Sequence, residues 1–167
     1  MSVLPIVRLP DPILKKPTLP VQRMSPEVSR LIDGMLATMR HHPRCVGVAA
    51  PQVGSPLRIA VMDASVHPKT TTSHGPLVLV NPRIVASEGI LAGREGCLSV
   101  PDFTGNVRRA GRIHLVAHNR AGEELRIWME GFEAVVAQHE VDHLDGKLFL
   151  DRVANTATDV FKRKTYL

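Results

Sequence analysis

Residues 138–144, Gln-His-Glu-Val-Asp-His-Leu, restrict the fold and chemistry of this chain more than any other segment. His139 and His143 are four residues apart, so on an α-helix both imidazoles lie on one face and can bind one metal ion. Glu140 follows the first histidine, where its carboxylate could reach a water molecule held by that metal. This His-Glu-x-x-His pattern is typical of hydrolytic metal enzymes, and we favour it over a surface helix that carries the same residues without a function.

The predicted metal site needs a third protein ligand, because catalytic zinc-type sites have three protein ligands and one open position. The common metalloprotease arrangements place a Glu or His ligand downstream of the second histidine. Residues 144–167 contain neither residue type, which excludes those arrangements. The third ligand must come from upstream or from Asp145, Asp151 or Asp159.

The best upstream candidate is Cys97, within Glu-Gly-Cys-Leu-Ser at residues 95–99. Gly93 and Gly96 precede Cys97, and glycine lets the backbone approach a ligand or substrate closely. A thiolate is a strong ligand for zinc or ferrous iron. A single cysteine is more often a small buried apolar residue, but beside an incomplete two-histidine site the ligand interpretation is favoured.

Residues 45–52, Cys-Val-Gly-Val-Ala-Ala-Pro-Gln, form a third segment, which is rich in small residues and ends in an amide side chain. Together with residues 95–99 and 138–144, in that order, it resembles the three signature segments of the peptide deformylases. Residues 6–14 also resemble the N-terminus of that family. The one mismatch is Cys45, where the family's first motif has glycine.

The resemblance implies a fold and an activity. The expected fold is α+β, a single catalytic domain over residues 1–167 with mainly antiparallel strands around a central helix that carries His-Glu-x-x-His. Residues 153–167 would form a short basic tail. The expected reaction is hydrolytic removal of the formyl group from the N-terminal formylmethionine of newly made polypeptides. Formamide hydrolysis needs an activated water, a polarised carbonyl and a proton for the leaving amine, which suits the predicted residues.

The resemblance also assigns roles to individual residues. The metal ligands would be Cys97, His139 and His143. Glu140 would take a proton from the attacking water and hand it to the departing amine. The Gln52 side chain and the Leu98 backbone N–H would stabilise the tetrahedral intermediate. Val46 and Gly47 would pair with the peptide backbone. A methionine-sized pocket would be lined by Phe132, Val135, Val136 and His139, although ordinary core packing explains such a helix face equally well.

One divalent metal ion is the expected cofactor. The resemblance implies ferrous iron in cells and zinc or nickel in isolated forms, and the predicted ligand types accept all three. The expected partners are nascent formyl-Met polypeptides, with a transient ribosome contact. The net charge is only +5, and the absence of a basic run interleaved with aromatic residues argues against specific nucleic-acid binding.

The expected location is the cytoplasm, without a membrane anchor. No apolar run is long enough to span a bilayer. The N-terminus has Pro5, Arg8, Pro10 and Asp11 where a signal peptide would need an unbroken apolar stretch. Two cysteines without such a signal predict free thiols in a reducing compartment.

Hydrophobic periodicity predicts two helices, over residues 25–41 and from Gly131 to Gly146. Short aliphatic segments predict strands at residues 57–62, 76–80, 84–86, 112–118 and 124–129. Residues 4–22 should wrap over the domain, and residues 63–75 should form an exposed loop. We expect no site role for His41, His42, His67, His74, His114 and His118.

Two acidic residues near the predicted ligands allow more than one interpretation. Asp142 should point away from the ligand face, where it either orients a histidine or forms a surface salt bridge. Glu95 could orient a ligand or line the pocket, but we do not expect it to be catalytic.

We expect Cys45 to be a wall residue of the substrate cleft, with its sulfur outside bonding distance of the metal.

Two other function classes stay open. The first is a protein of this fold that is inactive or acts on a different acyl group, which Cys45 and the unusual residues 102–107 allow. The second is a structural metal site in a non-enzymatic binding module. Glu140 and Gln52 argue against the second class, because a closed structural site needs neither residue.

Overall fold

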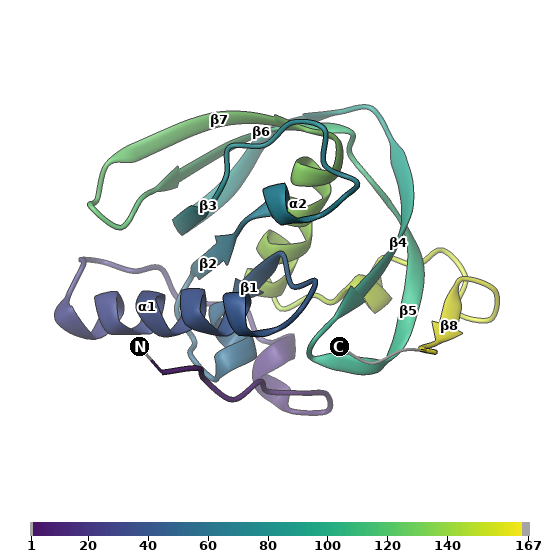
Figure 1. Cartoon of the computed structure of the whole chain (residues 1–167), viewed down its shortest axis with the longest axis horizontal. Coiled ribbons are helices and arrows are strands. Elements are labelled where there is room, and N and C mark those ends of the chain that lie inside the picture. The colour runs from purple at the N-terminus through teal and green to yellow at the C-terminus, as the bar shows by residue number, and fades with distance from the viewer. Residues whose placement is uncertain (1, 165–167) are drawn as a thin grey trace.

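The computed structural model describes residues 2–164, and its first long element, helix α1 (Pro26–His41), begins where the sequence predicts a helix start (Figure 1). The Ser25 hydroxyl accepts a hydrogen bond from the Val28 backbone N–H at 3.2 Å, and Pro26 occupies the first turn, where no N–H donor is needed. Ile32, Met35 and other buried residues of α1 pack against a sheet, so the predicted amphipathic helix is confirmed.

Two antiparallel sheets make up most of the remaining structure. The larger sheet has the order β1-β2-β3-β6-β7, formed by β1 (Gly47–Ala49), β2 (Ile59–Met62), β3 (Leu77–Glu88), β6 (Arg112–His118) and β7 (Glu124–Glu130). The smaller sheet has the order β4-β5-β8, formed by β4 (Leu91–Cys97), β5 (Val100–Arg109) and β8 (Val160–Lys162). Every pairing of these strands is antiparallel, which confirms the predicted α+β class.

The strands differ from the sequence prediction in their number and in their bounds. The segments predicted at 76–80 and 84–86 belong to one strand, β3. Its pairing with β6 shifts register between Val80 and Arg83, which accommodates Asn81 and Pro82 without ending the strand. Strands β1, β4 and β5 were not predicted. Strand β1 has only three residues, β4 is largely exposed, and β5 has Gly105 and Arg109 at two of its buried positions, so none shows a clear apolar alternation. Strand β8 lies inside the predicted tail, where a three-residue strand is too short to give a periodic signal. Of that tail, residues 165–167 lie outside the described residues.

Helix α2 (Gly131–Leu144) follows directly after β7 and lies between the larger sheet and the β4–β5 pair (Figure 1). Its small residues Ala134 and Ala137 are fully buried against the larger sheet. This close packing brings residues 139–143, on the second half of the helix, to the space between the two sheets. None of the helices within residues 2–164 is long and apolar enough to cross a membrane.

The N-terminal segment wraps over the domain, as predicted. The Val7 backbone N–H donates to the Gln52 carbonyl at 2.7 Å, and the Leu9 N–H donates to the Ser99 carbonyl at 3.0 Å. Further along, the Thr18 N–H donates to the Leu144 carbonyl at the end of α2 at 2.9 Å. These bonds tie the segment to the elements that surround the site.

The end of α2 provides a test of this packing. Gly146 has φ of 76°, and a Cβ there would lie 2.8 Å from the Lys15 carbonyl oxygen. Gly122 has a similar φ of 82° with nothing within 4 Å of a Cβ. Because Gly146→Ala adds a backbone clash to the left-handed strain, we expect it to lower the free energy of unfolding by about 2–4 kcal/mol, against about 1 kcal/mol for Gly122→Ala. Urea denaturation measures both; equal losses would contradict the packing described here.

Candidate metal centre

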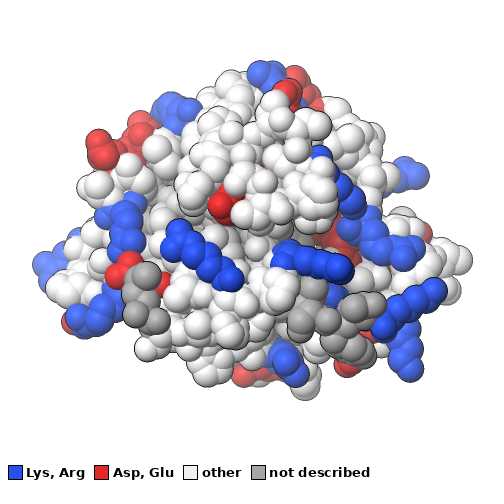
Figure 2. Space-filling model, viewed as in Figure 1, with Lys and Arg blue, Asp and Glu red and all other residues white. Residues whose placement is uncertain are grey.

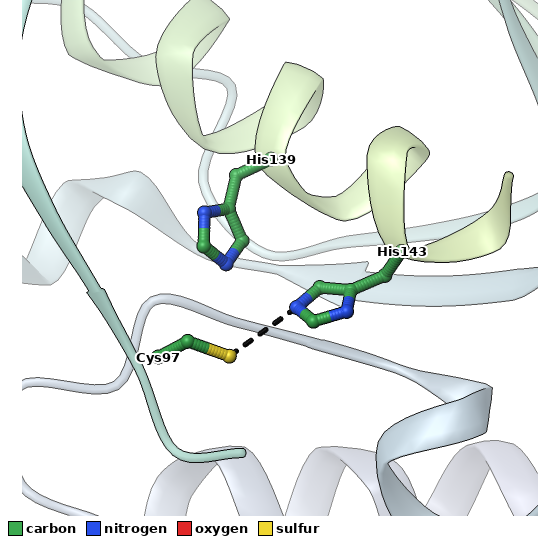
Figure 3. A group of neighbouring side chains, drawn as sticks. All are labelled: Cys97, His139 and His143. Carbon is green, nitrogen blue, oxygen red and sulfur yellow. Dashed lines mark hydrogen bonds between the residues drawn. The ribbon is translucent and has the colours of Figure 1, made fainter. Parts of the chain in front are cut away.

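Three side chains from two elements converge between the sheets (Figure 3). His139 and His143 come from α2, and Cys97 comes from the end of β4. One ligand atom from each lies within 4.8 Å of the others, and the Cys97 sulfur is 3.3 Å from Nε2 of His143. Cys97 and His143 are buried, and His139 is largely so. The structure therefore brings together the three residues that the sequence singled out as metal ligands.

The buried centre stabilises positive charge, which is a proton on His139 when no metal is bound and which a metal ion would replace. Burial opposes a charge on the Cys97 thiol, but His143 and His139 outweigh that effect and hold its pKa well below the ordinary value. Burial likewise disfavours the charged His139 ring, yet Cys97 and Glu95 raise its pKa well above the ordinary value. A thiolate beside two imidazoles is a donor set that fits zinc or ferrous iron.

A buried network orients His139 from behind. Nδ1 of His139 lies 2.8 Å from Oε1 of Glu95, whose carboxylate also accepts two hydrogen bonds from Arg109, at 2.7 and 2.9 Å. Arg109 reaches Oδ2 of Asp142 with its third donor at 2.7 Å, and Arg152 binds the same carboxylate. Such a partner fixes the ring orientation and leaves Nε2 of His139 free for a metal. Asp142 is therefore buried in a network and does not form a surface salt bridge.

Glu95 is held ionised by this network. Burial raises its pKa, but the hydrogen bonds from Arg109 and His139 outweigh burial and lower the pKa to about 2. Glu95 both orients His139 and lines the adjacent cavity, so both alternatives drawn from the sequence apply.

Glu140 lies against β1 in the space left by a glycine. Its side chain is buried, Oε1 has no hydrogen-bond partner among residues 2–164, and burial raises its pKa. A Cβ on Gly47 would lie 2.5 Å from Oε2 of Glu140, so only glycine leaves room for the carboxylate at this point of β1. The unpaired oxygen and the raised pKa suit a group that exchanges a proton.

Gln52 faces the same centre from the short 3-10 helix η2 (Ala50–Val53). Its Oε1 accepts the Ala49 backbone N–H at 3.0 Å, which fixes the orientation of the carboxamide. Nε2 then donates to the Cys97 sulfur and to Oγ of Ser99, both at 3.2 Å. The amide donor therefore points at the position where the predicted ligands meet.

A cavity of about 410 Å³ opens beside this centre. Its lining includes the predicted catalytic and substrate residues Val46, Gly47, Gln52, Leu98, Phe132, Val135, Val136, His139 and Glu140. His67, to which the sequence gave no role, also lines the cavity, with its ring 4.4 Å from that of Phe132. No sequence signal could have placed it there, because the contact joins a loop to a distant helix.

Cys45 also lines the cavity, as a wall residue. Its thiol donates to the Gly47 carbonyl at 3.3 Å, and burial raises its pKa to about 12. It forms no disulfide and does not belong to the group of Cys97, His139 and His143. This is the arrangement expected for a tolerated replacement of the motif glycine.

Comparison with known proteins agrees with this geometry. The family model for polypeptide deformylase matches residues 3–159. The peptide deformylase of Syntrophobacter fumaroxidans is 41% identical over 98% of this chain and 94% of its own length. A crystal structure of the Legionella pneumophila peptide deformylase superposes with a TM-score of 0.83 at 40% identity, covering 92% of this chain and 87% of the other. The Met-Ala-Ser-bound class I type b enzyme of Acinetobacter baumannii gives a TM-score of 0.84 at 36% identity, covering 91% and 100%.

The network behind His139 yields a prediction. Arg109→Gln removes the cation between two buried carboxylates, so we expect the free energy of unfolding to fall by about 3–5 kcal/mol. Arg108→Gln is the matched control, because Arg108 is the exposed neighbour on the same strand and should change stability by less than about 0.5 kcal/mol. Denaturant titration measures both variants. Similar values for the two would mean that the buried network does not stabilise the site.

Proposed function

The chain belongs to the polypeptide deformylase family, and from that premise we propose how its centre removes the formyl group from the N-terminal formylmethionine of newly made polypeptides. The observation that carries the proposal is the Cys97–His139–His143 group with the unpaired Glu140 carboxylate in the same cavity. We propose that α2 is the central element of this arrangement, since it supplies two ligands and the carboxylate.

Cys97, His139 and His143 would hold one divalent metal ion. When bound, such a metal supplies a water of lowered pKa and polarises the formyl oxygen. The soft thiolate and the two imidazoles accept ferrous iron, zinc or nickel. We propose ferrous iron in cells, with zinc or nickel in isolated protein.

Glu140 would carry the proton. As a general base it accepts a proton from the attacking water, and as a general acid it delivers that proton to the departing amine of methionine. Burial supports both steps, because it raises the pKa of Glu140 and stabilises the protonated form between them. Gly47 keeps the carboxylate in place without a competing side chain.

Gln52 and Leu98 would stabilise the negative oxygen of the tetrahedral intermediate. The Gln52 carboxamide is oriented in advance by the Ala49 N–H, so Nε2 faces the centre before the reaction begins, and the N–H now donated to the Cys97 sulfur or to Ser99 would pass to the oxyanion. Leu98 follows the ligand Cys97 directly and lines the same cavity, which suits its backbone N–H as a second donor.

The peptide would add to β1 as an extended strand. In the sheet order β1 is an edge strand, and Val46 and Gly47 line the cavity at that edge. An exposed edge offers backbone donors and acceptors to an extended chain. The methionine side chain would then enter the apolar part of the cavity, at Phe132, Val135 and Val136, beside His139.

We further propose that residues 1–167 work as one catalytic domain in the cytoplasm. The partners would be nascent formyl-Met chains, and exposed Lys162 and Lys164 could make a transient, salt-sensitive contact with the ribosome. Arg163, which lies between these two lysines in the predicted basic tail, lines the cavity instead.

The proposed function is tested by formate release from formyl-Met-Ala peptides, with metal content measured on the same sample. Acetyl-Met-Ala serves as the comparison substrate. Formate release by the metal-loaded protein supports the proposal. Turnover of the acetyl peptide alone would indicate a different acyl substrate, and metal binding without any turnover would indicate a structural site.

Glu140→Gln tests the proton carrier. The amide is nearly isosteric but cannot accept a proton, so we expect metal content to persist and formate release to fall by about 10²–10⁴-fold. Glu130→Gln, an exposed position just before α2, is the matched control and should keep full activity. A metal-loaded Glu140→Gln protein with near-normal turnover would remove Glu140 from this role.

The identity of the metal gives a further prediction. With ferrous iron bound by Cys97, activity should decay in air and survive anaerobic purification or nickel substitution, because iron promotes oxidation of a thiolate ligand. Chelation should abolish activity in each case, and re-addition of the metal should restore it. Full activity of an aerobically purified zinc form would identify zinc as the working metal.

A further inference from the structure

Arg163 has a buried guanidinium whose donors are not used. Its Nε and Nη2 are buried and have no hydrogen-bond partner among residues 2–164. Buried donors are normally satisfied, because an unmade hydrogen bond carries the full desolvation penalty of the group. The unused donors are therefore available to a partner that lies outside residues 2–164.

The position of Arg163 is well defined by its neighbours. Its backbone N–H donates to the Asp102 carbonyl at 2.8 Å, which extends the pairing of β8 with β5. Two residues earlier, the Phe161 ring lies under the Arg94 guanidinium, 3.8 Å from the ring centroid. These contacts fasten the end of β8 to both β4 and β5.

The guanidinium lies at the junction of two cavities. Arg163, Cys97 and Leu98 line both the cavity of about 410 Å³ at the metal centre and a second cavity of about 490 Å³. A Cβ on Gly96 would collide with Nη2 of Arg163, so the guanidinium lies directly on the backbone next to the ligand Cys97. A chain that leaves the metal centre toward the second cavity passes this point.

The charge around the junction favours an anionic group. Arg44, Lys69, Arg94 and Arg163 line the first cavity, against only two carboxylates, and the second cavity adds Arg8 and Asp102. Glu95 is already paired with Arg109 and His139, and Glu140 is proposed to carry the proton. Lys and Arg side chains also outnumber acidic ones across the middle of the face in Figure 2.

We propose that Arg163 is a specificity-determining residue that binds a carboxylate side chain at the second or third residue of the formylated peptide. The inference rests on the proposed function. An extended peptide advances about 3.3 Å per residue, so with formylmethionine at the metal the next residues reach the junction. A carboxylate accepts the unused donors of a guanidinium in a charge-assisted pair, which a neutral amide replaces poorly.

Matched peptide pairs test the proposal. Formyl-Met-Glu-Ala is compared with formyl-Met-Gln-Ala, and formyl-Met-Ala-Glu with formyl-Met-Ala-Gln, all with amidated C-termini so that the side chain is the only carboxylate. The metal-loaded wild type should show a kcat/KM about tenfold higher for the Glu member of at least one pair. Most of this difference should come from a lower KM for the Glu peptide.

Variants separate binding from a structural role. Arg163→Met should reduce the ratio of kcat/KM for the Glu peptide to that for the Gln peptide to about one. Arg163→Lys should keep part of the preference, because lysine retains the positive charge but lacks the planar guanidinium that binds a carboxylate with two hydrogen bonds. Lys162→Met is the control, since it removes the same charge from an exposed neighbour on β8 and should keep the wild-type ratio.

A Glu/Gln ratio near one in the wild type would overturn the proposal, as would an unchanged ratio in Arg163→Met. Arg163→Met that slows both peptides by the same factor would also overturn it, because it would show a structural role alone. If the wild type releases no formate from any peptide, the proposed function fails instead. Calorimetric binding of Met-Glu-Ala and Met-Gln-Ala amides then tests Arg163 independently, with the same expected preference.

Discussion

The Arg109 guanidinium joins the elements that carry the proposed metal ligands. It extends from β5, binds Glu95 on β4 and reaches Asp142 on α2. Cys97 lies two residues after Glu95, and His143 directly follows Asp142, so one buried cation sets the spacing between the two halves of the centre. Burying these charges is unfavourable in itself, and the geometry compensates because each of the three guanidinium nitrogens donates to a carboxylate.

Close backbone approach is a second constraint on the site. Gly47 leaves the space that the Glu140 carboxylate occupies, and Gly96 leaves the space that the Arg163 guanidinium occupies. In both cases a charged side chain from a distant element rests on the backbone of a signature segment. Cys45, where the family motif is expected to have glycine, forms part of the cavity wall, and its thiol donates to the Gly47 carbonyl.

The two sheets contribute different parts of the cavity. The larger sheet supplies an open edge at β1 and supports α2, whereas the smaller sheet supplies Cys97 and the basic junction at Arg163. Strand β8 pairs with β5 and brings Arg163 to this second part. Arg163, which lies beyond all three signature motifs, therefore takes part in the cleft.

The sequence by itself determined that His139 and His143 share one helical face, with Glu140 next to the first histidine. Residues four positions apart lie on the same side of an α-helix. Through its resemblance to a known family it also indicated Cys97, Gln52 and the α+β class. Only the tertiary structure decided the surroundings: the Arg109 network, the role of Glu95, the cavity position of His67 and the inward side chain of Arg163. These contacts join residues that are far apart in the chain, and a local pattern holds no information on such pairs. Strands β4 and β8 escaped detection for a related reason, since an exposed or very short strand lacks the apolar alternation that marks a buried one.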